Sequence, residues 1–324
     1  SSTKVLFILA SGRTGSTILG NVLGEMEAFF HAGELRTLWG QGLLKSRWCG
    51  CGMPVGDCPF WTDVLTSGFG SVDAGKIYGW QRHEVRHRHT LKLLRSTPQS
   101  SRSEGLESYL DAAARLYRAI SKTSGASVIV DSSKRQPDAA ALRLMPGIQP
   151  YWLHLVRDPR AVSYSWQRHK ASPGAAGGRR TEMLRTGPLT SSRKWIVSSL
   201  FGEALRRRVE DRYLCVRYED FVRHPETTLR TIGDFVGRPE ASLPVKNENT
   251  VELGTNHTAG GNPDRLNTGT VQLRSDDEWI EKQLPLHRLT VTSMALPLLR
   301  RYGYPIQVKR HANKHGDALL ARGH

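Results

Sequence analysis

Residues 4–17 read KVLFILASGRTGST, an unbroken apolar run followed by a loop of small polar residues. An apolar run without alternation is typical of a strand that is covered on both faces, as in a parallel sheet. The loop occupies residues 11–17, and the sequence TILGNVL at residues 17–23 continues with apolar residues at helical spacing. The sequence therefore predicts that the chain opens with a strand, a glycine-containing loop and a helix.

Three later segments have the same apolar character, and a polar cluster stands at the end of each. The segments are SVIVD at residues 127–131, YWLHLV at 151–156 and RYLCVR at 212–217, and the clusters are DSSK at 131–134, RDPR at 157–160 and YED at 218–220. Ligands of open α/β sheets bind at the carboxyl ends of the strands, so we expect these clusters to lie beside the first loop. The predicted fold is α/β, with a P-loop-like central parallel sheet flanked by helices.

The composition allows one large domain or two small ones, and we favour one. The 324 residues are 38% hydrophobic, which is enough for a substantial core. We predict a single domain over residues 1–310 with a helical insertion at about 62–126, where residues 80–123 are charged and helix-permissive. Residues 171–187 and 257–273 are predicted to be irregular, and residues 311–324 to form a basic tail.

The sequence favours a cytoplasmic location without a membrane span. The longest apolar run has strand length and falls far short of the ~18 residues that cross a bilayer. Nothing in the sequence marks it for export. The four cysteines are too few for a disulfide framework in a chain of this size.

The chain is strongly basic. Lys and Arg number 46 against 30 Asp and Glu, a formal charge of +16 that attracts polyanions. The basic residues are spread along the chain, and we expect Trp152, Trp166 and Trp195 in the core or a pocket wall rather than as a stacking repeat. We therefore predict a small polyphosphorylated ligand and no nucleic-acid partner. A nucleic-acid-binding module remains an alternative, with steeply salt-dependent binding.

The first loop has the character of an anion-binding site. A strand that leads through a short loop into a helix presents backbone N–H groups and the positive end of the helix dipole to an anion. The candidate residues are Ser11, Gly12, Arg13, Thr14, Gly15, Ser16 and Thr17. A nucleoside triphosphatase would carry a lysine near the end of the loop, where Ser16 and Thr17 stand here. A P-loop kinase with Asp131 on magnesium is therefore a disfavoured alternative.

Residues 157–165, RDPRAVSYS, form the second motif. An arginine at a strand end and a serine about two helical turns later can hold one phosphate from two sides. Together with the first loop, this motif resembles the sulfotransferases that use 3′-phosphoadenosine 5′-phosphosulfate (PAPS). The resemblance runs from about Lys4 to Trp279. It implies in-line transfer of a sulfuryl group to a hydroxyl of an acceptor, with adenosine 3′,5′-bisphosphate (PAP) as the second product.

The resemblance also implies how the donor is held. The first loop, Arg13 included, would bind the 5′-phosphosulfate, and Arg157 and Ser165 would bind the 3′-phosphate. Tyr218 is expected in the same site because it follows a predicted strand. The sequence GGNPDR at residues 260–265 resembles the family segment that folds over the 3′-phosphate, which adds Asn262 and Arg265. The basic pair and glycine that close the site in cytosolic members are absent.

The form GRTGS resembles the tyrosylprotein, carbohydrate and bacterial members more than the animal cytosolic ones. Tyrosylprotein members use a glutamate shortly after the first helix, which assigns Glu34, in AGELR, as the base. His31 is the rival base. Lys134 matches the lysine that stabilises the bridging oxygen as its bond to sulfur breaks.

Cys49, Cys51 and Cys58 have a spacing at which thiolates can share a zinc ion. Three ligands leave the tetrahedron incomplete, so we predict no metal site and a local turn packed by PFW at residues 59–61. Cys215 is expected to be buried in its strand as a small hydrophobe. The acceptor, a small molecule, glycan or lipid, is expected to contact residues 38–127 and 171–192, because acceptor pockets of this architecture come from insertions and loops.

Overall fold

A five-stranded parallel sheet lies at the centre of the molecule, with the strand order β2-β3-β1-β4-β7. We describe a computed structural model that places residues 2–168, 171–172, 181–182 and 184–308. The strands of this sheet are β1 (Thr3–Leu9), β2 (Phe29–Gly33), β3 (Val128–Lys134), β4 (Ile148–Val156) and β7 (Tyr213–Arg217). The four predicted strands and the α/β fold class are confirmed, and β2 is an addition to them.

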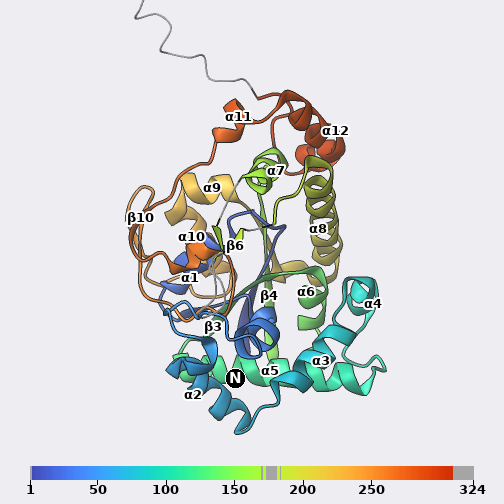
Figure 1. The fold of residues 1–324 in the computed structure, drawn as a ribbon, viewed down its shortest axis with the longest axis vertical. Helices are drawn as coiled ribbons and strands as arrows, with labels where there is room; N and C mark the ends of the chain where they lie inside the picture. Colours follow the sequence, from blue (N-terminus) through green and yellow to red (C-terminus); the bar gives the residue numbers. More distant parts are fainter. Residues whose placement is uncertain (1, 169–170, 173–180, 183, 309–324) are drawn as a thin grey trace, which may run out of the picture.

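Alternation along β1 explains why helices cover both faces of the sheet. Val5 and Phe7 pack on one face, in a core shared with α5 (Glu104–Ser124), α6 (Gln136–Leu142) and α8 (Pro188–Val209). Leu6 and Ile8 pack on the other face, against α1 (Ser16–Gly24), α9 (Tyr218–Arg223) and α10 (Pro225–Phe235). Figure 1 shows α1 and α10 on one side of the sheet and α6 and α8 on the other. The unbroken apolar run thus corresponds to a strand buried on both faces.

Between β2 and β3 the chain forms a group of helices, which gather at the lower end of the molecule in Figure 1. They are α2 (Pro59–Phe69), α3 (Ala74–Glu84), α4 (Thr90–Arg95) and α5, with the short helices η1 (Leu35–Thr37), η2 (Leu38–Leu43), η3 (Val55–Asp57) and η4 (His87–His89). The apolar face of α5 joins this group to the sheet by burying Leu110, Tyr117 and Ile120. The limits of the insertion and of a single domain over residues 1–310 remain predictions.

The remaining elements complete the site's surroundings. They are α7 (Pro159–Gln167), β5 (Ala171–Ser172), β6 (Thr181–Glu182), η5 (Glu210–Arg212), β8 (Val245–Asn247), β9 (Thr250–Leu253), η6 (Pro263–Leu266), β10 (Gly269–Gln272), α11 (Glu278–Lys282) and α12 (Pro285–Arg301). The segment 257–273, predicted to be irregular, contains η6 and also β10, which pairs antiparallel with β9. Of the predicted loop at 171–187, residues 173–180 and 183 lie outside the described residues, as does the predicted tail at 311–324. In the described part of the chain, no helix is long and apolar enough to cross a membrane.

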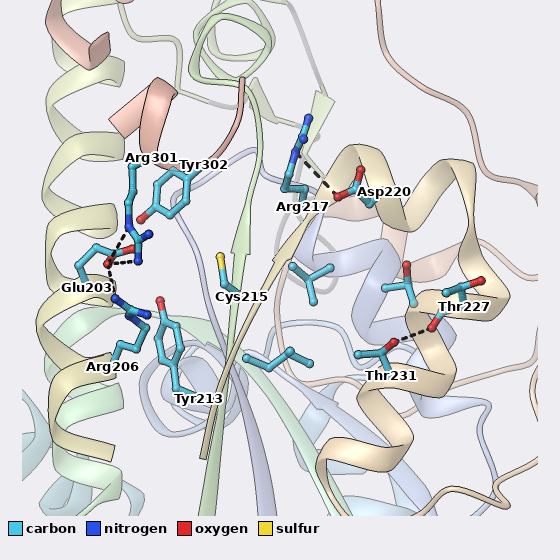
Figure 2. Close-up of a pocket in the computed structure, with 13 residues that line it drawn as sticks. Glu203, Arg206, Tyr213, Cys215, Arg217, Asp220, Thr227, Thr231, Arg301 and Tyr302 are labelled. Carbon is cyan, nitrogen blue, oxygen red and sulfur yellow. Dashed lines mark hydrogen bonds and ion pairs between the residues drawn. The ribbon is translucent and has the colours of Figure 1, made fainter. Parts of the chain in front are cut away.

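Cys215 is exposed, so its predicted burial was wrong. It lies on β7, an edge strand of the sheet, which among the described residues pairs with β4 alone. A groove of about 390 Å³ runs along this edge, and Figure 2 shows Cys215 in it between the Glu203 and Arg301 pair on one side and Asp220 on the other. None of the predicted site residues lines this groove.

Candidate functional site

A cavity of about 660 Å³ lies at the carboxyl ends of the sheet strands. Its walls come from the first loop, the ends of β2, β3 and β4, α7, α9 and the segment around η6. The lining residues are Gly12, Arg13, Gly15, Ser16, Thr17, Ile18, Glu34, Lys134, Arg157, Ser165, Trp166, Arg168, Tyr218, Gly261, Asn262, Asp264 and Asp276. All predicted site residues line this cavity except Ser11, Thr14 and Arg265.

The first loop ends in a helix whose N-terminus has no side-chain cap. Gly15 precedes α1 with φ 92°, and the first turn of α1 contains no acidic residue. Ser16, Thr17 and Ile18 supply the N–H groups of that turn, and all three line the cavity. These N–H groups and the helix dipole favour an anion at this end of the cavity.

Ser11 and Thr14 shape the loop from beneath. The Thr14 hydroxyl donates to the Ser11 carbonyl oxygen at 2.8 Å, and the two hydroxyl oxygens lie 3.0 Å apart. Both residues are buried. Arg13, between them, adopts φ 69°, and its guanidinium carbon lies 5.1 Å from the ring centroid of Trp166. The loop therefore presents Arg13 to the cavity and keeps the two hydroxyl groups inside.

Two aromatic rings leave space only for glycine in this loop. A Cβ atom on Gly15 would lie 2.3 Å from Tyr218 Cε2, and one on Gly12 would lie 2.6 Å from Trp166 Cζ2. Both rings line the cavity. The close approach keeps the loop backbone against the cavity wall, where its N–H groups can reach an anion.

We expect Gly15→Ala to destabilise the protein more than Gly125→Ala. Gly125, at the end of α5, has φ 71° and open space around its Cβ position, so alanine there costs only the left-handed strain of about 1–2 kcal/mol. At Gly15 overpacking against Tyr218 adds about 1–3 kcal/mol. Urea denaturation measures both free energies of unfolding. Equal losses would mean that the ring moves aside without cost.

Arg157 is held between the loop and an acidic residue. Its Nη1 donates to the carbonyl oxygen of Arg13 at 3.2 Å, and its Nη2 lies 3.1 Å from a carboxylate oxygen of Asp276. The guanidinium carbon lies 4.7 Å from the ring centroid of Tyr218. Arg168 contacts the same oxygen of Asp276 at 3.2 Å. The guanidinium of Arg157 is thus fixed at the cavity, and the carboxylate that partners it has a second cation.

Glu34 directly follows β2 and Lys134 ends β3, and their side chains form an ion pair. Lys134 Nζ donates to Glu34 Oε1, and both side chains line the cavity. Lys134 ends β3 with φ 67°, a left-handed conformation that is strained for a lysine. The pair brings a candidate base and a candidate cation together at one point of the cavity wall.

Asp131 shapes the turn that carries Lys134. Its carboxylate accepts from the Tyr117 hydroxyl at 2.6 Å, from the Ser133 amide at 2.8 Å and from the Ser133 hydroxyl at 2.5 Å. Burial raises the pKa of Asp131 to about 6. Asp131 does not line the cavity, which removes the magnesium ligand that the kinase alternative required.

His31 lies inside the protein, away from the cavity. Its Nδ1 is 3.2 Å from Asn21 Oδ1, and its Nε2 is 3.0 Å from the Ser132 hydroxyl. Burial and the charge of Lys134 lower the pKa of His31 to about 3. Both ring nitrogens therefore have buried partners, so the geometry favours Glu34 over His31 as the group that meets an acceptor.

The segment around η6 contributes Asn262 but turns Arg265 inward. The Asn262 side chain caps η6 by accepting from the Asp264 amide, and Asn262 lines the cavity. Arg265 is buried, and its Nη2 donates to the Trp48 carbonyl oxygen at 2.7 Å. In this arrangement the Arg265 side chain does not line the cavity, where the phosphate that it is predicted to contact would bind.

Four further residues line the cavity that were not predicted from the sequence: Ile18, Arg168, Asp264 and Asp276. Trp166 was predicted to lie in the core or in a pocket wall. Trp166 lines the cavity, and its position directly after Ser165 on α7 was a usable signal. Asp276 reaches the cavity through pairing with Arg157, 119 residues away. No local pattern in the sequence marks a contact of that separation.

The chain belongs to the sulfotransferase family. The family model described as "Sulfotransferase family" matches residues 79–242, just over half of the chain. The matched segment contains Lys134, Arg157, Ser165 and Tyr218, whereas the first loop and Glu34 precede it. No curated protein sequence gives a match to this chain.

One solved sulfotransferase domain has a similar fold, and two further solved structures match this chain with lower scores. The domain from the curacin biosynthetic pathway is 18% identical, with a TM-score of 0.52 over 94% of this chain and 99% of that one. The domain from the Synechococcus PCC 7002 olefin synthase is 22% identical, with a TM-score of 0.49 over 94% of this chain and 96% of that one. A sulfotransferase from Alicyclobacillus acidocaldarius is 12% identical, with a TM-score of 0.39 and coverages of 93% and 96%.

Proposed function

We propose that this chain transfers the sulfuryl group of PAPS to a hydroxyl of a small-molecule, glycan or lipid acceptor by in-line displacement. One observation carries the proposal: the uncapped N-terminus of α1, Arg157 with Ser165, and the Glu34 and Lys134 pair all line one cavity. These groups provide two separate anion sites, which suit a donor that carries phosphates at the 3′ and 5′ positions of its ribose. They also provide a base for the acceptor hydroxyl. Membership of the sulfotransferase family supports the same reaction.

The two anion sites hold the donor by its opposite ends. The N–H groups at the start of α1 and the guanidinium of Arg13 bind the 5′-phosphosulfate. Arg157 and Ser165 bind the 3′-phosphate, and Asp276 then keeps its contact with Arg168 at 3.2 Å. Tyr218 stacks beneath the Arg157 guanidinium, and the Asn262 amide closes the rim. Arg265 has no part in this mechanism.

The transfer itself uses Glu34 and Lys134. Glu34 takes the proton of the acceptor hydroxyl as the acceptor oxygen bonds to sulfur. The bond from sulfur to the 5′-phosphate oxygen breaks, and its electron pair leaves with PAP. Protonation of Glu34 weakens its ion pair, which frees the Lys134 ammonium to stabilise the charge on the leaving oxygen. Arg13 adds a second positive charge, and this mechanism assigns no metal ion to the transfer.

The location and the partners remain predictions from the sequence. They are a cytoplasmic setting, no nucleic-acid partner, and acceptor contacts from residues 38–127 and 171–192. The formal charge of +16 also serves the proposed function, because donor and product are both highly anionic.

A thermal-shift comparison tests the function against its rivals. The ligands are PAP, ATP with magnesium, and an oligonucleotide, each at matched concentration. A ligand at a hundred times its Kd stabilises the folded protein by about 2.7 kcal/mol, and we expect that response for PAP. A larger shift with ATP and magnesium would support the kinase instead, and a larger, salt-sensitive shift with the oligonucleotide would support nucleic-acid binding.

We expect Arg157→Ala to weaken PAP far more than adenosine 5′-phosphate. The substitution removes a charge-assisted hydrogen bond to the 3′-phosphate, worth about 1.5–3 kcal/mol, or a factor of roughly 10 to 150 in Kd. Arg157→Lys keeps the positive charge but loses the planar guanidinium, so its Kd for PAP should lie between those of the wild type and Arg157→Ala. Calorimetry measures all values. Equal losses of affinity for both nucleotides would show that Arg157 does not bind the 3′-phosphate.

A further inference from the structure

Four metal-binding side chains meet in one place outside the cavity. The ligand atoms of Cys49, Cys51, Cys58 and His257 all lie within 4.8 Å of one another. No metal was predicted from the spacing of the three cysteines, because a fourth ligand was missing. His257 is that fourth side chain, and it is separated from Cys58 by 199 residues of sequence.

Three of the six distances between these atoms are close to the edges of a zinc tetrahedron, and all six are within 4.8 Å. With Zn–S bonds of about 2.3 Å and a Zn–N bond of about 2.0–2.1 Å, S···S edges are about 3.8 Å and S···N edges about 3.5 Å. The Sγ atoms of Cys51 and Cys58 are 3.7 Å apart. His257 Nδ1 lies 3.3 Å from Cys58 Sγ and 3.9 Å from Cys49 Sγ. A single ion at the centre would therefore reach all four side chains without a rearrangement of the backbone.

The local fold presents the thiols in a compact hairpin. The Cys49 amide donates to the Met53 carbonyl oxygen at 2.7 Å, and the Gly52 amide donates back to the Cys49 carbonyl oxygen at 3.1 Å. Gly52 has φ 87°, which favours glycine in this turn. Cys58 directly precedes α2 and so lies at the positive end of the helix dipole.

The charge around the cluster suits an anionic metal centre. Three thiolates, one neutral imidazole and one divalent ion carry a net charge of about −1. The buried guanidinium of Arg265 lies within electrostatic range of Cys49, Glu34 and Cys51. Its Nε and Nη1 atoms are buried without a hydrogen-bond partner. A negatively charged centre beside them would add to the charge of Glu34 in compensating this buried cation.

His257 is fixed by packing and by its neighbours in sequence. Its ring stacks on Phe60, with ring centroids 5.0 Å apart. The Gly50 amide donates to the Thr258 carbonyl oxygen at 3.1 Å, and Cys49 forms a β-bridge with Ala259. These backbone contacts hold the hairpin and the segment that carries His257 side by side at the cluster.

We propose that Cys49, Cys51, Cys58 and His257 bind one structural zinc ion, which fastens the hairpin at residues 48–54 to the segment at residues 256–265. Four protein ligands leave no open position for a substrate, so the ion stabilises the fold and takes no part in transfer.

The zinc ion would act at the cavity through this segment. The Ala259 amide donates to the Ala32 carbonyl oxygen at 2.9 Å, two residues before Glu34. Further along, Gly261 and Asn262 line the cavity. Loss of the ion would release both the support behind Glu34 and the rim around Asn262. This second consequence rests on the proposed function, whereas metal binding itself does not.

Elemental analysis of the purified full-length chain tests the site directly. We expect about one zinc per chain in the wild type and in Cys215→Ser, an exposed cysteine outside the cluster. We expect Cys51→Ser and His257→Asn to lose the metal or to release it to a chelator at least tenfold more readily. Equal zinc content in all four proteins, together with equal release of zinc to the chelator, would overturn the proposal.

Cobalt titration of the metal-free wild type avoids dependence on variants that fail to fold. Tetrahedral cobalt with thiolate ligands gives intense visible and charge-transfer bands, which we expect to saturate at one equivalent. The absence of such bands in reduced protein would contradict the proposal, as would a disulfide between Cys51 and Cys58 in freshly purified protein.

The two proposals fail separately. Zinc content and cobalt spectra are measured without any nucleotide, so a zinc-loaded protein that does not bind PAP would overturn the proposed function alone. A protein that binds PAP but takes up neither zinc nor cobalt would overturn the metal site alone. If both hold, removal of zinc from the wild type is expected to lower the unfolding temperature and to weaken PAP by about tenfold. Chelator treatment of a Cys51→Ser preparation that contains no zinc should change neither quantity.

Discussion

Glu34→Gln is expected to retain PAP binding and to lower turnover with an aliphatic alcohol by ~10²- to 10⁴-fold. Glutamine keeps the size of the side chain and can still accept a hydrogen bond from Lys134, but it cannot take a proton from the acceptor. Calorimetry with PAP and steady-state kinetics with PAPS measure the two quantities on the same preparation.

Acceptors of different acidity distinguish a catalytic base from a purely structural role of Glu34. A nitrophenol gives up its proton without much help, so the loss on Glu34→Gln should be smaller for it than for an aliphatic alcohol. If Glu34 only braced the cavity wall, donor affinity would fall and all acceptors would suffer alike. Near-normal turnover would exclude Glu34, and His31→Ala would then show whether the buried histidine takes part.

Lys134→Gly is expected to lower turnover by ~10²- to 10³-fold without loss of stability. The ammonium stabilises charge that appears on the leaving oxygen only as the bond to sulfur breaks, so its removal affects kcat more than donor affinity. Lys134 has φ 67°, a conformation that glycine adopts without strain. The variant therefore removes the charge while the turn keeps its shape, which urea denaturation checks.

Lys134→Arg and the double variant serve as controls for this role. Arginine restores a positive charge and should recover part of the turnover. Because Lys134 and Glu34 form an ion pair, the effects of Lys134→Gly and Glu34→Gln should not add. Additive effects, or a turnover that Lys134→Gly leaves unchanged, would contradict the role of the ammonium at the leaving oxygen.

The strands of the sheet were predictable where burial on both faces requires an unbroken apolar run in the sequence. β1, β3 and β4 are covered on both faces, and their unbroken apolar runs predicted them. β2, with the sequence FFHAG, was not predicted, because it is short and contains His31, whose ring is accommodated by Gly20 on α1. The exposure of Cys215 also follows from strand order, which the sequence of β7 does not reveal.

The site was predictable where one motif supplies adjacent residues. The first loop and the sequence after β4 are local, and the structure places Arg13, Arg157 and Ser165 at one cavity. Contacts between distant segments left no such record. His257 joins the cysteines only through the folded chain, and Asp276 joins Arg157 across 119 residues. Arg265 matched a motif, yet its side chain points to Trp48 because the hairpin at residues 48–54 lies behind it.

Transfer of radioactive sulfur from labelled PAPS tests the central claim most directly. The purified chain is incubated with labelled PAPS and a panel of phenols, sugars and lipid alcohols, and both products are quantified. We predict that label appears on at least one hydroxyl acceptor together with an equal amount of PAP, that ATP does not replace PAPS, and that Glu34→Gln suppresses the transfer. PAP release without any labelled acceptor, or phosphorylated products formed from ATP and magnesium, would contradict the assignment.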